Sequence, residues 1–287
     1  MPRTQSPKLK NKKSSPTMAD AADRHVLYQK SVQAPETEID FFLKTYKKLR
    51  KKKPLILRED FCGTALLSVT WCQTHKQRQA LGVDLCQETL DWARMHNLKP
   101  AGTEVASRVS LINANVLEVN KPKSDITCAT NFSYSVFNTR DALRNYFKRV
   151  RKGLKKDGLF IADMFGGTET FDTLEEEREI DGGAFTYIWE QEYFNPITHH
   201  IICHIHFAFP DGSRLERAFT YEWRLWTIPE LSELLQEAGF NKVRIFWEEY
   251  QDDGDKNNEY LEGTGNFIEV SEVENQESWV SYIVAET

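Results

Sequence analysis

Two acidic residues, Glu59 and Asp84, are the most informative positions for chemistry because each ends a short apolar run. Glu59 is followed by a turn that contains Gly63, and a helix is predicted to begin near Thr64. Such a turn brings backbone N–H groups at a helix N-terminus close to a ligand. Asp84 is suitably placed to accept hydrogen bonds from ribose hydroxyls. Together with a third run that ends at Asn113-Ala114-Asn115-Val116, these residues predict an adenosine-binding edge.

A group of histidines is the second feature with chemical potential. On a strand, His200, His204 and His206 would share one face, and such a row could bind a metal or act as a general base. No carboxylate accompanies the row at close spacing, and a half-exposed antiparallel strand explains it equally well. We therefore predict no metal site and keep His200 and His204 as candidate bases.

The elements that must position these residues alternate between apolar runs and amphipathic segments after Pro54. The predicted strands are Leu55–Leu57, Ala80–Asp84, Val109–Asn113, Ile126–Asn131 and Leu159–Met164. The predicted helices between them are Leu66–His75, Glu88–His96 and Arg140–Leu154. Strands separated by helices of this length indicate βαβ units and a parallel sheet, so the fold class is α/β.

The rest of the chain divides into four further segments. We expect a disordered basic tail at 1–17, an N-terminal helical lid at 18–53 with Thr37 as an N-cap, an antiparallel β insertion at 168–226, and a helix with two closing strands at 227–287; the α/β core occupies 54–167. The insertion is predicted from Ala184–Tyr193, His199–Phe209 and Arg214–Arg224. The closing elements are Ile228–Ala238 (N-cap Thr227), Lys242–Trp247 and Trp279–Ala285.

Composition excludes several classes of protein. The 287 residues carry a net charge of −6, with 40% hydrophobic residues, which fits a globular protein. No apolar run approaches the roughly 20 residues that span a bilayer, and we expect a cytoplasmic protein whose five cysteines are reduced. The tail is basic and the stretch 248–277 is strongly acidic, so without its tail the domain disfavours binding of a polyanion.

On these residues the sequence resembles the class I S-adenosylmethionine (SAM)-dependent methyltransferases. The family signature after the first strand is acid-x-Gly-x-Gly-x-Gly; Glu59 and Gly63 match it, whereas Phe61 and Ala65 stand where the first and third glycines are usual. The resemblance implies a Rossmann-like, seven-stranded, mostly parallel sheet with a reversed last strand. It also implies SAM as the cofactor and transfer of its methyl group.

The resemblance implies a role for each matching residue in holding the cofactor. Glu59 and Gly63 would lie near the methionine part of SAM, Asp84 would hold the ribose, Leu85 would pack on the adenine, Asn115 and Val116 would bind the adenine edge, and Asn131 and Phe132 would lie beside the methyl group. For the two acids, the alternative is that each caps the helix that follows its strand.

The acceptor is expected to be a small molecule with an N or O nucleophile. Trp189, Tyr193 and Arg224 are the candidate substrate residues, although Arg224 could instead pair with Glu190 or Glu222. Candidate bases are Tyr28, Asp163, His200 and His204; Tyr28 could close over the sulfonium or merely pack its helix.

Two alternatives remain open at this stage. Asn131-Phe132-Ser133-Tyr134 resembles the Asn-Pro-Pro-Tyr signature of enzymes that methylate nucleobase or glutamine nitrogens, so an RNA or protein methyltransferase that uses the basic tail is one of them. The other is a non-catalytic interaction module whose cofactor cleft is blocked, for which Phe61 and Ala65 are the only indications.

Overall fold

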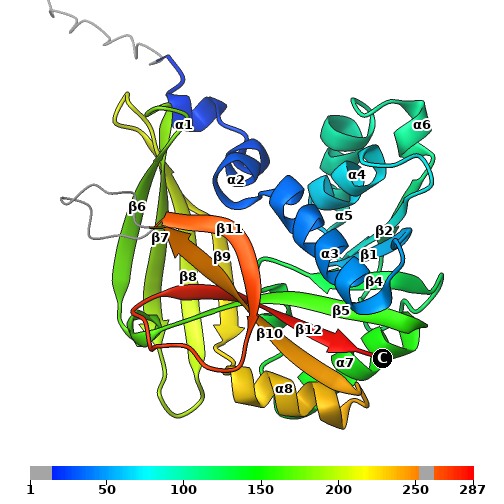
Figure 1. The fold of residues 1–287 in the computed structure, drawn as a ribbon. Coiled ribbons are helices and arrows are strands. Elements are labelled where there is room, and N and C mark those ends of the chain that lie inside the picture. Colours follow the sequence, from blue (N-terminus) through cyan, green and yellow to red (C-terminus); the bar gives the residue numbers. More distant parts are fainter. Residues whose placement is uncertain (1–14, 252–261) are drawn as a thin grey trace, which may run out of the picture.

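Two β-sheets and eight α-helices make up the computed structural model, which describes residues 15–251 and 262–287 (Figure 1). The strands of the larger sheet are β1 (Ile56–Asp60), β2 (Gln79–Asp84), β3 (Val109–Asn113), β4 (Ser124–Ala129), β5 (Leu154–Gly166), β10 (Lys242–Gln251), β11 (Glu262–Val270) and β12 (Trp279–Glu286). The strands of the smaller sheet are β6 (Leu174–Ile180), β7 (Phe185–Phe194), β8 (His200–Ala208) and β9 (Arg214–Arg224). The α-helices are α1 (Met18–Ala21), α2 (Arg24–Val32), α3 (Pro35–Arg50), α4 (Leu66–Gln73), α5 (Gln87–Ala93), α6 (Thr103–Ala106), α7 (Arg140–Gly153) and α8 (Ile228–Glu237).

The larger sheet confirms the predicted α/β class. Its order is β11-β10-β12-β5-β4-β1-β2-β3, and β1 to β5 run parallel to one another. The last strand, β12, runs antiparallel to both of its neighbours, β5 and β10, as expected for a reversed last strand. The predicted sheet had seven strands, and the structure adds an eighth, β11, at the edge.

Strand β11 lies in the acidic stretch and was not predicted because its acids and glycines hide its apolar side chains. Phe267 of β11 packs edge-on against Tyr282 of β12 at 4.6 Å between ring centroids, and it also contacts Phe41 of α3 at 5.4 Å. These contacts place β11 over α3. Residues 252–261 of the same acidic stretch lie outside the described part of the chain.

Helices cover both faces of the larger sheet and bury two separate cores. On one face, Phe42 and Tyr46 of α3 pack with Leu57 of β1 and residues of α4. On the other face, the apolar sides of α7 and α8 pack against β5 and β12, with Phe147 and Leu234 fully buried. The five central strands are therefore held rigidly, and their carboxyl ends form a fixed platform, which we call the carboxyl edge.

The helix ends confirm one predicted cap and correct another. The Thr227 hydroxyl accepts a hydrogen bond from the backbone N–H of Glu230, and the Glu230 carboxylate accepts one from the backbone N–H of Thr227, which completes a capping box at the start of α8. The predicted N-cap at Thr37 is wrong. Helix α3 begins at Pro35, whose fixed φ suits the first helical position, so Thr37 lies inside the helix.

The smaller sheet contains one strand more than predicted. Strands β7, β8 and β9 form the expected antiparallel meander. The additional strand, β6, pairs with β7 at the edge, so the order of the sheet is β6-β7-β8-β9. The sequence of β6 is LEEEREI, in which the charged residues conceal the apolar alternation that predicts a strand. As Figure 1 shows, this sheet stands beside the larger one, with α1 and α2 next to it.

Three further expectations concern features outside the sheets. Residues 1–14 of the predicted tail lie outside the described residues. All five cysteines are free, and only Cys86 is exposed. Within 15–251 and 262–287, no helix is long and apolar enough to cross a membrane, and no cluster of His, Cys, Asp or Glu side chains could hold a metal ion.

Candidate active site

The turn after β1 adopts a glycine-like backbone although two of its three key residues are not glycine. Phe61, Gly63 and Ala65 all have left-handed φ angles, at +59°, +50° and +54°. These are the three positions of the signature, of which only Gly63 is a glycine. Residues with a Cβ pay roughly 1–2 kcal/mol to adopt this conformation, so the surrounding packing must enforce it.

The Phe61 ring contributes to that packing and leaves the turn open. Its centroid lies 5.8 Å from Tyr146 and 6.1 Å from Phe137, within the core beneath the sheet face that α7 covers. At Gly63, a Cβ would meet no heavy atom within 4 Å. The turn therefore borders open space at Gly63, and the partly buried Phe61 ring packs against the core.

Glu59 has one occupied and one free carboxylate oxygen. Its Oε2 accepts hydrogen bonds from the Ser68 backbone N–H (3.0 Å) and the Ser68 hydroxyl (2.5 Å), so Glu59 does cap the first turn of α4. No residue in the described part of the chain donates to Oε1. Burial raises the pKa of Glu59 to about 7, with the Ser68 hydrogen bonds opposing the shift. The unpartnered Oε1 is therefore suited to accept a hydrogen bond from a cation.

Asp84 connects the turn after β1 to the end of β2. Its Oδ2 accepts the Gly63 N–H at 2.8 Å, and its Oδ1 accepts the Cys86 N–H at 2.8 Å. Each oxygen keeps a further lone pair, and the side chain remains partly exposed. The next side chain, Leu85, is 68% exposed, which is unusual for leucine and leaves an apolar surface beside an acid.

Arg58 holds the segment after β3 in place through hydrogen bonds to its backbone carbonyls. This buried guanidinium donates to the carbonyls of Val116 (2.9 Å) and Val119, and its Nε pairs with Asp60 at 2.6 Å. Asn115 forms a local turn in which its Oδ1 accepts the N–H of Leu117 at 2.9 Å. The Val116 N–H has no partner within the described residues, so it is free to donate to a ligand.

A strained turn follows β4 and is fixed by a carboxylate from β5. Asn131 and Phe132 both have left-handed φ angles, at +55° and +57°. Their backbone N–H groups donate to the two oxygens of Asp163, at 2.7 and 2.9 Å. Burial raises the pKa of Asp163 to about 7, and these hydrogen bonds oppose the shift. Asp163 thus determines where Asn131 and Phe132 lie.

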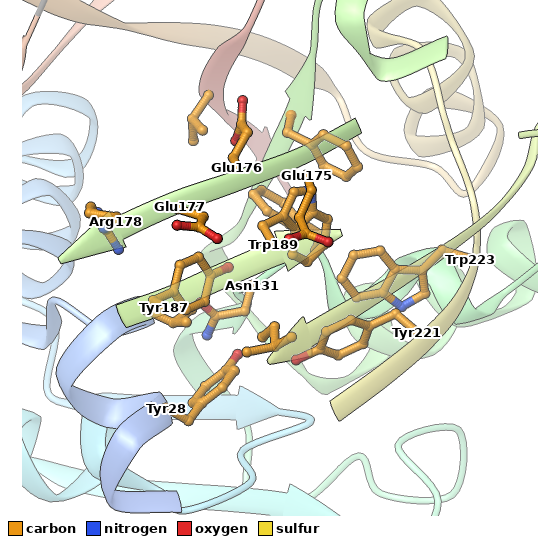
Figure 2. Close-up of a pocket in the computed structure, with 15 residues that line it drawn as sticks. Tyr28, Asn131, Glu175, Glu176, Glu177, Arg178, Tyr187, Trp189, Tyr221 and Trp223 are labelled. Atoms are coloured by element: carbon orange, nitrogen blue, oxygen red, sulfur yellow. The ribbon is translucent and has the colours of Figure 1, made fainter. Parts of the chain in front are cut away.

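A cavity of about 800 Å³ opens beside this turn, and we call it the acceptor cavity. It lies between α2, the carboxyl edge and the inner face of the smaller sheet, and Figure 2 shows side chains from these elements around it. Its aromatic lining consists of Tyr28, Phe132, Phe165, Tyr187, Trp189, Tyr221 and Trp223. Asn131 also lines it, so the acceptor cavity reaches the carboxyl edge.

Of the predicted substrate residues and bases, Tyr193, Arg224 and His200 do not line the acceptor cavity. Tyr193 is exposed at the far end of β7, where its hydroxyl accepts a hydrogen bond from Asn195. Arg224 stacks over Trp226 at 3.9 Å and pairs with Glu230 at 2.8 Å, so neither predicted pairing, with Glu190 or Glu222, is formed. His200 is likewise not part of the lining.

His204 lies on the outer face of the smaller sheet. Its ring nitrogens contact Glu192 (2.5 Å) and Thr220 (2.8 Å), and the neighbouring His206 contacts Glu190 and Glu216. The carboxylates missing from the local sequence are therefore supplied by β7 and β9. A role of His200 or His204 as a base stays a prediction, and their placement does not favour it.

The N-terminal helices close one side of the site. The Gln29 side-chain amide donates to Thr64 Oγ1 at 2.8 Å, and Trp92 Nε1 of α5 donates to Asp23 Oδ2 at 2.7 Å. At the other end of α2, Arg178 of β6 donates to the Ser31 carbonyl. Helix α2 therefore connects the turn after β1 to the smaller sheet.

Sequence reasoning missed several residues that shape this site. Gln29, Thr64 and Arg178 act through contacts between segments far apart in the sequence, so no local pattern reveals them. Glu176 of β6 was missed with its strand. The alternation of Leu174, Glu176, Arg178 and Ile180 was the one available signal, because these residues share the inner face of β6.

Among the comparisons with known proteins, the one with solved structures gave matches. The sequence matches no family model and no curated protein. Among solved structures, a SAM-dependent methyltransferase from Clostridium acetobutylicum ATCC 824 has a TM-score of 0.64 at 19% identity, over 91% of this chain and 96% of that chain. The amino pentose methyltransferase CalS10 from Micromonospora echinaspora has a TM-score of 0.63 at 12% identity, over 92% and 96%. The sugar N-methyltransferase KedS8 from Streptoalloteichus sp ATCC 53650 has a TM-score of 0.59 at 14% identity, over 100% and 98%.

Proposed function

Because the chain has the fold of the class I SAM-dependent methyltransferases, we propose that it transfers a methyl group from SAM to a small-molecule acceptor. One observation carries this proposal. The ends of β1, β2, β3 and β4 present unused hydrogen-bonding groups and an exposed leucine at one edge, and a large aromatic cavity opens beside them. Ligands of open parallel sheets bind at this edge.

The residues at the carboxyl edge fit SAM by their chemistry. The free Oε1 of Glu59 suits an ammonium group, and the open space at Gly63 admits the methionine part. Asp84 can accept from two ribose hydroxyls. Leu85 offers an apolar surface for adenine, while Asn115 and the free Val116 N–H offer polar contacts for its edge.

When bound, SAM supplies a methyl group that its sulfonium has already activated. The chain then has to position the acceptor and exclude water, and fixed alignment of this kind contributes roughly 7–11 kcal/mol to rate enhancement. The turn of Asn131 and Phe132, held by Asp163, borders both the carboxyl edge and the acceptor cavity. We propose Tyr28 as the lid residue, since it lines the acceptor cavity from α2, and Asp163, whose raised pKa lets it hold a proton near pH 7, as a candidate base behind the turn of Asn131 and Phe132.

The two alternatives have less support. A blocked cofactor cleft would require Phe61 or Ala65 to fill it, but the Phe61 ring packs against Tyr146 and Phe137, Ala65 is fully buried, and Gly63 borders open space. A macromolecular acceptor would rely on the basic tail, most of which lies outside the described residues. The solved structures above include enzymes described as acting on an amino pentose and on a sugar nitrogen, which agrees with a small acceptor here.

Isothermal titration calorimetry with SAM and with S-adenosylhomocysteine tests the proposal. We expect saturable binding of both, and a 10- to 100-fold loss of affinity in Asp84→Ala, because charged hydrogen bonds contribute roughly 1.5–3 kcal/mol. Asp141→Ala, which removes an exposed acid from α7, is the matched control and should bind normally. Absence of binding by folded wild-type protein would overturn the proposed function.

A further inference from the structure

The acceptor cavity combines aromatic walls with an excess of negative charge. From this we propose that the methyl acceptor is a cationic amine, whose ammonium group binds between Glu176 and the aromatic side chains. The inference rests on the proposed function, because the amine is taken to be the molecule that receives the methyl group. It goes further by naming the chemical class of that molecule.

The aromatic wall is built from β7 and β9, which flank β8 in the smaller sheet. Tyr221 and Trp223 of β9 stack at 4.3 Å between ring centroids, and Trp189 of β7 lies 6.3 Å from Trp223. Tyr187 continues the wall along β7, and Tyr28 faces it from α2 (Figure 2). The faces of such rings carry partial negative charge and attract ammonium groups by about 0.5–2 kcal/mol each.

The charged side chains of the lining come from β6 and sum to a negative value. Glu175, Glu176 and Glu177 contribute three acids, and Arg178 is the single base among the lining residues. Arg178 is already engaged, because it donates to the Ser31 carbonyl and lies over the Tyr187 ring at 5.5 Å. Arg178 keeps its positive charge in both contacts, so the three acids and one base leave the lining with a net charge of −2.

Strand register assigns Glu176 to the aromatic side of β6. Glu176 lies opposite Trp189, and Arg178 lies opposite Tyr187, so these four side chains share the face that lines the acceptor cavity. Glu175 approaches Arg214 at 3.9 Å, whereas Glu176 has no ion pair within the described residues. Glu176 is only partly shielded from water, and this partial desolvation and the nearby Glu169 carboxylate raise its pKa above the usual value.

A bound ammonium must lose a proton before its nitrogen can react. The proton passes to a carboxylate of the cavity, which frees the nitrogen lone pair. That lone pair forms the new N–C bond while the S–C bond breaks and its electrons remain on sulfur. Positive charge then resides on the methylated nitrogen, so the same negative cavity accommodates acceptor and product.

Matched amine and alcohol probes test the inference in the full chain without SAM. The pairs are tryptamine and tryptophol, phenethylamine and 2-phenylethanol, and cyclohexylamine and cyclohexanol, titrated by calorimetry at pH 7. We expect each amine to bind at least tenfold more tightly than its alcohol. Glu176→Gln should reduce amine affinity about tenfold and leave alcohol affinity unchanged.

Glu179→Gln is the matched control, because it removes the same charge from the same strand but outside the lining of the acceptor cavity. It should preserve the preference for amines. Equal binding of amines and alcohols in all three pairs, no binding of any probe, or an unchanged preference in Glu176→Gln would overturn the inference. The SAM titration separates the two proposals: SAM binding without amine preference overturns only this one, whereas loss of SAM binding overturns the proposed function.

Discussion

Gln29 of α2 donates a hydrogen bond to Thr64 Oγ1 across 2.8 Å, and this contact joins the N-terminal helices to the turn after β1. Thr64 in turn has its carbonyl bound by the side chain of Asn97 at 2.7 Å. The turn is therefore held from two sides, by α2 and by the π-helical segment that extends α5.

This contact predicts that Gln29→Ala weakens cofactor binding without unfolding the protein. Gln29 is partly buried, and one neutral hydrogen bond contributes about 0.5–1.5 kcal/mol, so SAM affinity should fall roughly two- to tenfold. Titration calorimetry measures the affinity, and thermal unfolding reports the stability. Lys44→Ala removes an exposed side chain from α3 and serves as the control. Unchanged SAM affinity in Gln29→Ala would show that α2 does not support the turn.

The raised pKa of Glu59 predicts that this residue destabilises the folded protein more strongly as the pH rises. In the unfolded chain Glu59 ionises near 4.5, whereas in the folded protein it does so at about 7. Folding is therefore unpenalised below pH 4.5, becomes less favourable as pH rises between the two values, and carries the full cost above pH 7. Glu59→Gln removes this cost, so its stability relative to wild type should increase by about 2–3 kcal/mol from pH 5 to pH 8.

Urea unfolding at pH 5, 6, 7 and 8, in the absence of SAM, measures this difference. Glu88→Gln, which neutralises an exposed acid on α5, should show no such trend. A stability difference between Glu59→Gln and wild type that stays constant over this range would mean that Glu59 is already ionised at pH 5 in the folded protein.

The left-handed backbone at Ala65 predicts an unusual tolerance for glycine. Ala65 is fully buried, and replacing it with glycine removes a methyl group but relieves backbone strain of roughly 1–2 kcal/mol. We expect Ala65→Gly to change the free energy of unfolding by less than about 1 kcal/mol. Ala129→Gly, at an equally buried position in β4, gains no such relief and should cost about 1–2 kcal/mol more than Ala65→Gly. Equal costs in chemical denaturation would contradict the strain.

The buried pair of Arg58 and Asp60 predicts a large loss when one charge is removed. Arg58→Met leaves the Asp60 carboxylate without its cation and two loop carbonyls without a donor, which should cost about 3–5 kcal/mol. The double variant Arg58→Met/Asp60→Leu should be destabilised by less than the sum of the two single variants. Denaturant unfolding of all three variants measures the coupling, and additive losses would show that the pair is not energetically linked.

The sequence predicts the larger sheet well because its signals are local. The run 159–162 is apolar throughout, as expected for a strand buried on both faces, and Thr227 carries its own cap signal. Strands β6 and β11 were not predicted because pairing with β7 and β10, rather than their own sequence pattern, stabilises them as strands. In β6 the inner-face residues Glu176 and Arg178 are charged, so period-two apolarity is broken where it would have been diagnostic.

The residues of the candidate site also differ in whether local sequence signals predict their position. Glu59, Gly63 and Asp84 follow predicted strands, and parallel pairing alone brings them to one edge. Residues of the smaller sheet were harder to assign, since a shift of one position exchanges the two faces of a strand. Trp189 lines the acceptor cavity, and its role toward the substrate stays a prediction, whereas Tyr193 lies beyond a bulge in β7 and outside that lining. Long-range contacts such as Gln29 with Thr64 depend on the completed fold.

The conformation of the turn after β1 bears on how such turns can be detected. Its three left-handed residues reproduce the path that glycines normally permit, and the enforcing agent is the aromatic packing around Phe61. The turn requires left-handed φ angles, and glycine is one of several residues that can adopt them when the surrounding packing enforces this conformation. Profiles that score glycine at each of the three positions will rank chains of this kind low, whereas a search on the φ pattern, or on an aromatic residue anchored beneath the turn, will retrieve them.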